Sequence, residues 1–253
     1  MTTFIFKIIA MITMTIDHAG DALFNDNMMM RSVGRIAFLI YAFLMAEGFR
    51  HIRGNNEKVK DHLIKLIFLA AVSEFCYDFE EFGFEFAKYF ESQNNIITLL
   101  LSFLGMMGFE FFKGNKKAIV SIVFTTAFMN YACLSNYKMV GVLIVYAFYL
   151  YLDYVEKHNL NYLQKLLILI AIITIYIPVY QFARMNFTLG PEYIKALFKY
   201  GSWWFAHYFT MFILAGYNGK LGNKNKFINY IYSIYYPAHL FVIGLLKLLI
   251  IIK

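Results

Sequence analysis

The chain has 253 residues, of which 60% are hydrophobic, 20% aromatic and only 15% charged, and its formal net charge is +7. A soluble domain is about 45–50% apolar and about 25% charged, so this chain has too few polar side chains to cover a water-soluble globule of its size. A lipid bilayer removes that requirement, but only helices and closed barrels can span it. The apolar runs are about 20 residues long and do not alternate with polar residues, which favours helices.

The apolar runs predict an all-α, polytopic transmembrane helix bundle. We interpret as spans residues 4–24, 33–52, 61–79, 94–112, 117–134, 139–155, 164–182, 202–217 and 227–252. This gives about nine spans, and eight to ten are compatible with the shorter runs, which can be tilted or re-entrant. The first run is too long for a signal peptide and lacks a small-residue cleavage site, so we expect it to remain as a span. With no internal repeat, residues 1–253 are predicted to form one domain.

The Lys and Arg residues predict the orientation of the bundle. With the N-terminus in the cytoplasm, most of the 23 Lys and Arg residues fall on the cytoplasmic side, including Arg50, Arg53, Lys113 and Lys117. Cytoplasmic loops of membrane proteins carry such an excess. We therefore expect a multi-pass protein of the cytoplasmic (inner) membrane, in which these cations set the orientation and do not indicate a nucleic-acid partner.

Ionisable side chains inside an apolar span are costly, so each one is a candidate site residue. Asp17 and His18 lie in the outer half of the first span. Adjacent residues do not share a helix face, so Asp17 is expected to orient a group other than His18, and it shares its face with Asp21. His18 is a candidate general base or acid, and a histidine satisfied by a neighbouring helix is the alternative.

Arg35 lies near the outer start of the second span. An antiparallel neighbour would bring it to the depth of Asp17 and His18, where it can pair with a carboxylate or stabilise an oxyanion. The alternative is an arginine that extends to the membrane interface. Gly34 beside it permits close approach of two helices.

Glu47 lies twelve residues after Arg35, about 18 Å closer to the cytoplasm. It either lines a route from the cytoplasm or pairs with Arg50 or His51 near the surface, and we favour the pairing.

Glu74 and Asp78 stand at positions i and i+4, so both carboxylates share one face of the third span. Two carboxylates at that spacing need a cation, and Arg35 is the predicted partner. Asn94 opens the fourth span, either as part of the same site or as a helix cap. With the polar residues of the first span, these positions predict a polar cavity in the outer half of the bundle.

Tyr236 and His239 share one face of the last span, and Pro237 between them predicts a kink. Such a stripe is typical of a cavity, but also of an interfacial aromatic belt. Trp203 and His207 form a similar pair, which we interpret first as interfacial.

Several of these segments together resemble the TraX family of integral membrane acetyltransferases, named for the enzyme that acetylates the N-terminal amine of F-type pilin. The resemblance is carried, in family order, by KIIAMITMTIDHAGD, GRIAFLIYAFLMAEGFRHIRG, LAAVSEFCYDF, QNNIITLLL, YKMVGVLIVYAF and IYYPAHLF, from residue 7 to about residue 241. The family tends to have a proline within the stretch IAFLIYAF, and Asp-Tyr-Gly where this chain has Asn136, Tyr137 and Lys138.

The resemblance implies an acetyl-CoA-dependent N-acetyltransferase with a peptide or pilin-like acceptor. It implies His18 and Arg35 as the central pair. The supporting catalytic candidates are Asp17 and Glu74; the candidates for substrate binding are Glu47, Asp78, Asn94, Tyr236 and His239; the candidates for binding the phosphates of acetyl-CoA are Arg50, Arg53, Lys113 and Lys117. In this mechanism His18 takes the proton of the attacking amine and Arg35 stabilises the oxyanion.

Three alternatives remain open from the residues alone. O-acetylation of an envelope glycan would use the same chemistry, since nothing in the chain selects the acceptor. Intramembrane His, Asp and Glu also build the proton relays of a transporter or flippase, although no inverted repeat is found. A non-catalytic assembly or immunity protein would bind no acetyl-CoA. No metal is predicted, because Cys76 and Cys133 lack ligand spacing.

Overall fold

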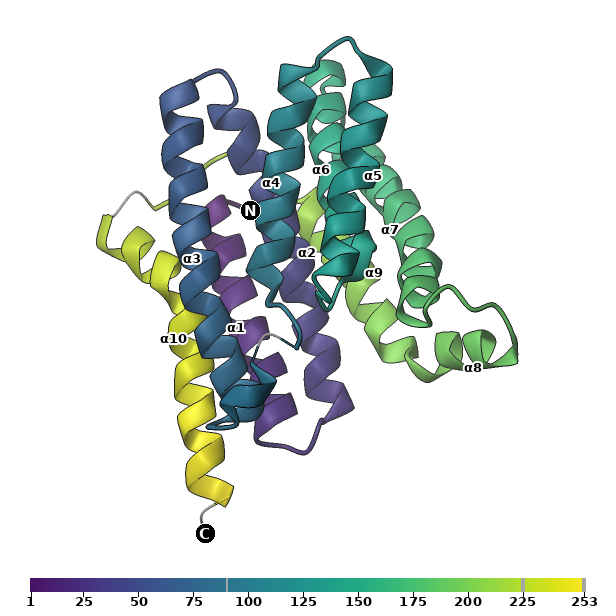
Figure 1. Cartoon of the computed structure of the whole chain (residues 1–253). Coiled ribbons are helices and arrows are strands. Elements are labelled where there is room, and N and C mark those ends of the chain that lie inside the picture. The colour runs from purple at the N-terminus through teal and green to yellow at the C-terminus, as the bar shows by residue number, and fades with distance from the viewer. Residues whose placement is uncertain (90, 224–225, 252–253) are drawn as a thin grey trace.

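The computed structural model describes the backbone of residues 1–89, 91–223 and 226–251, and within these ranges all side chains except those of 226–230, 233 and 251. Over the described ranges the chain is helical and has no strand (Figure 1). The helices are α1 (Thr3–Ala22), α2 (Met28–Ile52), α3 (Asn56–Phe82), the short 3₁₀ helix η1 (Phe86–Lys88), α4 (Asn95–Phe111), α5 (Lys116–Ala132), α6 (Lys138–His158), α7 (Tyr162–Arg184), α8 (Pro191–Lys199), α9 (Gly201–Ala215) and α10 (Lys226–Ile251). The all-α bundle predicted from the sequence is confirmed.

Each predicted span coincides with one long helix, with ends shifted by a few residues. The largest shifts are at the starts of two helices: α2 begins at Met28 instead of residue 33, and α3 begins at Asn56 instead of residue 61. Four helices within the described ranges, α1, α2, α6 and α7, are long and apolar enough by themselves to cross a membrane; α4 and residues 234–250 of α10 are shorter apolar helices. The sequence prediction missed α8, whose nine residues are too few to span a bilayer.

Asparagine caps the start of five helices, α2, α3, α4, α5 and α7. The side chains of Asn27, Asn55, Asn94, Asn115 and Asn161 each accept a hydrogen bond from a backbone N–H in the first turn of the following helix. The first N–H groups of a helix have no partner within the helix, and an asparagine side chain satisfies one of them. These caps set where the helices begin between the apolar runs.

Helix α2 is the centre of the bundle. It contacts α1, α3, α4, α6 and α9. Residues 36–40 are all buried, and five consecutive positions cover the whole circumference of a helix. Figure 1 shows α1, α3 and α10 on one side of α2 and α5, α6, α7 and α9 on the other. Side chains on opposite faces of α2 therefore meet different groups of helices.

The two ends of the bundle are named here by their arginines. The Arg50 end holds the end of α2 and the start of α3, and the Arg31 end holds the loop between α1 and α2. Helix α8 follows α7 at the Arg31 end (Figure 1). The N-terminus is held by the segment after α9, where the backbone N–H of Asn218 donates to the carbonyl of Met1 over 3.0 Å.

Candidate active site

The closest contact between α1 and α2 is built around Asp17 and Arg35. Nη2 of Arg35 donates to both carboxylate oxygens of Asp17, at 3.1 and 2.9 Å. Gly34 makes this approach possible, because a Cβ at that position would overlap the Asp17 side chain. The prediction that an antiparallel neighbour brings Arg35 to the depth of Asp17, where it pairs with a carboxylate, is confirmed.

Arg31 extends this ion pair by one helical turn. Its Nε lies 3.3 Å from Oδ1 of Asp17, and its Nη1 forms an ion pair with Asp21 and lies 3.7 Å from Asp26. The shared face of Asp17 and Asp21 predicted from their i, i+4 spacing is therefore used to bind arginines from α2. Arg31 was not among the predicted site residues, although its position four residues before Arg35 places both arginines on one face of α2.

His18 points away from this pair, toward α3 and α10. Its Nδ1 lies 3.5 Å from Oε2 of Glu80, and its ring packs edge-on against His239 with centroids 5.2 Å apart. The neighbour that can orient His18 is thus Glu80. Asp17 contacts a different group, as we predicted from the different helix faces of adjacent residues. Glu80 is almost fully buried, with 1% of its surface exposed. Glu80 lies just past residue 79, where the third span was predicted to end, and it is helical because α3 extends three residues further, to Phe82.

His239 is held in one tautomer by its own helix. Its Nδ1 lies 3.0 Å from the carbonyl of Tyr235, so this nitrogen carries the hydrogen, and Nε2 is buried without a hydrogen-bond partner in the described part of the chain. Tyr236 packs against the His239 ring at 5.6 Å and is also buried. Both residues predicted on this face of α10 therefore lie in the interior. Helix α10 continues through Pro237.

Glu74 belongs to a separate polar cluster between α3 and α4. Its Oε2 accepts from the backbone N–H of Asn94 at 3.0 Å and from the Asn94 side-chain amide, whose oxygen caps α4 through Ile96. The predicted pairing of Arg35 with Glu74 is wrong. Arg35 faces α1, while Glu74 faces the N-terminus of α4, where free N–H groups and the helix dipole stabilise a carboxylate. Asp78 is fully buried on the same helix.

Two interior chambers meet at His18. One is polar, with a volume of about 130 Å³, and it lies toward the Arg31 end; the other is mostly apolar, with a volume of about 260 Å³, and it extends toward the Arg50 end. The polar chamber is lined by Asp17, His18, Asp21, Arg31, Arg35, Tyr77, Glu80, Asn95, Asn136, Tyr137, Tyr180, Arg184 and Trp203. The residues that line both chambers are Asp17, His18, Asn95 and Tyr137.

The structure therefore contains a polar cavity at the Arg31 end, but it holds only half of the polar positions that suggested it. Asp17, His18 and Arg35 line it, whereas Glu74, Asp78 and Asn94 do not. Tyr137 lines both chambers and stacks on Phe38, with ring centroids 3.6 Å apart. It is the central residue of the triplet in which this chain departs from the Asp-Tyr-Gly of the family.

The apolar chamber continues along α1 toward the Arg50 end. Met14, Phe38 and Leu99 are among its apolar walls, and Lys7 and His62 line it as well. The Nζ of Lys7 lies 5.1 Å from the ring centroid of Tyr232, which is another lining residue. No ionisable group interrupts the apolar pattern between Lys7 and Asp17, so the sequence gives no sign of a site in this part of the chain.

Trp203 forms part of the polar chamber instead of a membrane interface. It is 9% exposed, and the guanidinium groups of Arg35 and Arg184 lie 4.7 and 4.9 Å from its ring. The interfacial interpretation of Trp203 and His207 is therefore wrong, since His207 is buried as well. Helices α7 and α9 pack together here, which the local sequence pattern does not reveal.

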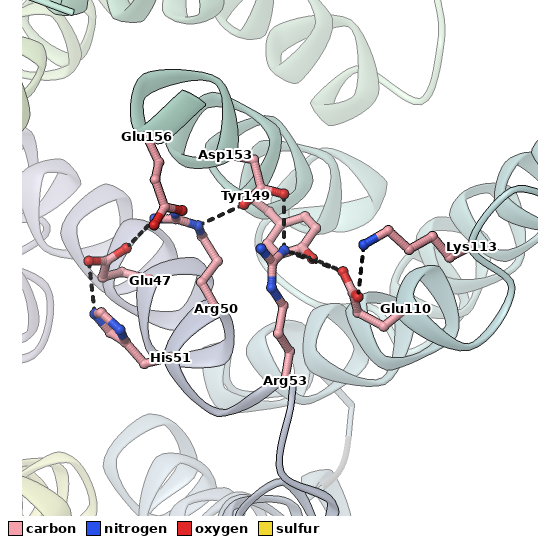
Figure 2. Close-up of polar contacts among 9 residues, drawn as sticks. All are labelled: Glu47, Arg50, His51, Arg53, Glu110, Lys113, Tyr149, Asp153 and Glu156. Carbon is pink, nitrogen blue, oxygen red and sulfur yellow. Dashed lines mark hydrogen bonds and ion pairs between the residues drawn. The ribbon is translucent and has the colours of Figure 1, made fainter. Parts of the chain in front are cut away.

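The arginines at the Arg50 end are engaged in ion pairs (Figure 2). Arg50 binds Glu47 and Asp153, each at 2.8 Å, and also Glu156. His51 lies 3.1 Å from the other oxygen of Glu47. The favoured interpretation of Glu47, pairing with Arg50 or His51, is confirmed for both partners.

Arg53 forms the second half of the same cluster. Its Nη1 lies 2.7 Å from the Tyr149 hydroxyl, 3.0 Å from Asp153 and 3.3 Å from Glu110, and Lys113 lies 3.6 Å from Glu110 (Figure 2). Arg50 and Arg53 thus tie α2 to α4 and α6. None of the four predicted phosphate-binding residues lines the apolar chamber, and Lys113 and Lys117 are exposed. No three His, Cys, Asp or Glu side chains in the described ranges are arranged to hold a metal.

The protein is a helical membrane bundle with a histidine between a polar and an apolar chamber. These two features define its class. Comparison with known families is more specific. The family model described as TraX protein matches residues 3–247, nearly the whole chain, and the chain belongs to this family. No curated protein and no solved structure matches the chain.

Proposed function

We propose that this protein is a membrane-embedded acetyltransferase. It would move an acetyl group from cytoplasmic acetyl-CoA to a peptide amine presented at the Arg31 end. Membership of the TraX family, which is associated with acetylation of F-pilin, supports the reaction class. The observation that carries the mechanism is the position of His18 at the junction of two chambers of opposite character.

The apolar chamber suits the donor. Lys7 and His18 both line it and stand eleven residues apart on α1, which is about 16 Å along the helix axis. The extended pantetheine arm of acetyl-CoA can span that distance and bring its thioester to His18 while the charged nucleotide stays at the Arg50 end. The geometry favours Lys7 and His62 for contacts near the entry. Binding of phosphates by Arg50 and Arg53 would require them to exchange carboxylate partners, and Lys113 and Lys117 remain predicted contacts.

The polar chamber suits the acceptor and the transition state. With the hydrogen of His18 on Nδ1, facing Glu80, Nε2 is available to take a proton from the amine. The amine nitrogen attacks the thioester carbonyl carbon, the carbonyl electrons move to oxygen, and Arg35 stabilises that oxyanion. Collapse then breaks the C–S bond, and the CoA thiolate leaves with the proton that His18 held. Asp17 positions Arg35 through two hydrogen bonds.

Purified protein in detergent, supplied with acetyl-CoA and a mixture of peptides with free N-termini, tests this proposal. CoA release and peptide mass report acetyl transfer, and we expect His18→Ala to lose activity by a factor of about 10² or more, as for other general bases. His158→Ala is the matched control, because His158 is exposed at the end of α6. Full activity in His18→Ala would exclude the role of His18.

The same assay separates the alternatives. Acetyl esters on a glycan instead of amides on peptides would identify an O-acetyltransferase. Substrate flux in vesicles without any CoA-dependent product would identify a transporter.

A further inference from the structure

The polar chamber contains three arginines, and only two of them have carboxylate partners. Arg31 is paired with Asp17 and Asp21, and Arg35 is paired with Asp17. Arg184, the last residue of α7, forms no ion pair with any residue in the described ranges. Its Nη1 is buried and has no hydrogen-bond partner there. The chamber therefore holds one arginine that forms no ion pair with a carboxylate of the described residues.

Aromatic rings hold the Arg184 guanidinium in place. Its Cζ lies 4.7 Å from the ring centroid of Tyr200 and 4.9 Å from that of Trp203. Cation–π contacts of this kind orient an arginine but accept no hydrogen bonds in the guanidinium plane. The donors of Arg184 are thus preorganised for an acceptor that lies in the chamber.

Helix α8 does not supply that acceptor. It is fixed next to Arg184 by two hydrogen bonds, from the Tyr193 hydroxyl to the carbonyl of Pro178 at 3.1 Å and from Nε1 of Trp204 to the carbonyl of Leu197 at 2.7 Å. The acidic residue of α8, Glu192, is already paired with Lys195 at 2.7 Å.

A buried guanidinium nitrogen with an unused donor, such as Nη1 of Arg184, costs free energy, and a carboxylate matches the planar donors of arginine in a bidentate geometry. Acetyl-CoA is not expected to provide this anion, because its charged end belongs at the opposite end of the apolar chamber. We infer that Arg184 binds a carboxylate of the acceptor, and that the acceptor is a peptide with an acidic side chain next to its free amino terminus. This inference rests on the proposed function.

The chamber that His18 and Arg184 share indicates where that acidic residue stands in the peptide. Both side chains line it, so an amino group at His18 and a carboxylate at Arg184 would lie in one connected space. The amino group belongs at His18, beside the Glu80 carboxylate, and the acidic side chain belongs at Arg184. A neutral residue in the second position would leave the guanidinium unpaired when the chamber fills.

Two peptides that differ in one group test the inference. Ala-Asp-Ala-Ala-amide and Ala-Asn-Ala-Ala-amide share a free N-terminus and a blocked C-terminus, so the Asp side chain is the only carboxylate. We expect the Asp peptide to bind wild-type protein at least about tenfold more tightly, as for a charge-assisted hydrogen bond. Arg184→Gln should abolish this preference and Arg184→Lys should keep part of it. Lys195→Gln, which removes an exposed cation on α8, should leave it unchanged.

Binding is read without acetyl-CoA from tryptophan fluorescence, because Trp203, one of the two tryptophans of the chain, lines the polar chamber and its ring lies 4.9 Å from the guanidinium of Arg184. Equal binding of the two peptides by wild type, or a preference retained in Arg184→Gln, would overturn the inference. Helix content and thermal unfolding show whether each variant has folded. If Arg184→Gln has not folded, the peptide preference of Arg184→Lys decides. Preference for phosphatidylethanolamine vesicles over both peptides would assign Arg184 to a lipid phosphate and overturn the peptide.

The failure of this inference is distinguishable from failure of the proposed function. If both peptides are acetylated equally well, the acetyltransferase stands and the role of Arg184 falls. If the Asp peptide binds through Arg184 and no acetyl group is transferred, the binding site stands and the acetyltransferase falls.

Discussion

Asp17 on α1 accepts two hydrogen bonds from Nη2 of Arg35 on α2, at 2.9 and 3.1 Å, and both residues line the polar chamber. Both side chains come from apolar helices, where an unpaired charge is costly. The pair therefore fixes the relative rotation and depth of α1 and α2, and it leaves His18, on the next face of α1, directed toward Glu80.

The close contact between α1 and α2 predicts that a larger residue at Gly34 destabilises the protein. A Cβ at this position would overlap Asp17, so Gly34→Ala should lower stability by about 1–3 kcal/mol and lower the midpoint of thermal unfolding in detergent. Gly48 on the same helix has no atom within 4 Å of a built Cβ. Gly48→Ala should therefore leave the midpoint unchanged or raise it slightly. Equal midpoints for the two variants would argue against the contact.

The Asp17–Arg35 pair should show strong energetic coupling. Asp17→Asn leaves Arg35 and Arg31 facing a neutral group, whereas the double variant Asp17→Asn with Arg35→Gln removes both charges of the central pair. A double-mutant cycle on unfolding free energy should give a coupling of about 1–3 kcal/mol. Additive effects of the two substitutions would show that the pair contributes no specific interaction.

Glu80 should influence the acetyl-transfer step through His18. We expect Glu80→Gln to lower kcat about tenfold or more and to leave KM for the peptide nearly unchanged, because it removes the group that faces Nδ1 of His18. Glu81→Gln is the matched control, since Glu81 is the neighbouring glutamate, is exposed and does not line the polar chamber. A loss of the same size in both variants would indicate a general effect on the end of α3.

The ion-pair cluster at the Arg50 end should act on stability. Asp153 binds both Arg50 and Arg53, so Asp153→Asn should destabilise the fold by about 1 kcal/mol, a modest value because the cluster is partly exposed to solvent. The destabilisation should shrink as salt is raised, because salt screens partly exposed charges. Lys113→Gln removes only an exposed partner of Glu110 and should leave the unfolding midpoint unchanged. Unfolding curves at two salt concentrations provide the measurement.

The sequence alone determined the helices and marked part of the site. A run of about 20 apolar residues forms a helix in a bilayer because every backbone polar group must be satisfied within it, and asparagine caps mark several of the starts. Three site residues could be recognised because each interrupts such a run: Asp17, His18 and Arg35. Gly34, directly before Arg35 in the chain, indicated a close helix neighbour.

Only the tertiary structure decided which of the polar side chains meet. Local spacing identifies the face of a helix that a residue occupies, but not which other helix covers that face. Glu74 contacts Asn94 instead of Arg35, and carboxylates from α4 and α6 pair with Arg50 and Arg53. Glu80 and Arg184 line the chamber of His18, although both lie just beyond the predicted ends of their spans, at residues 79 and 182. These relationships join residues that are 20 to more than 100 positions apart, and the packing of one helix on another sets them.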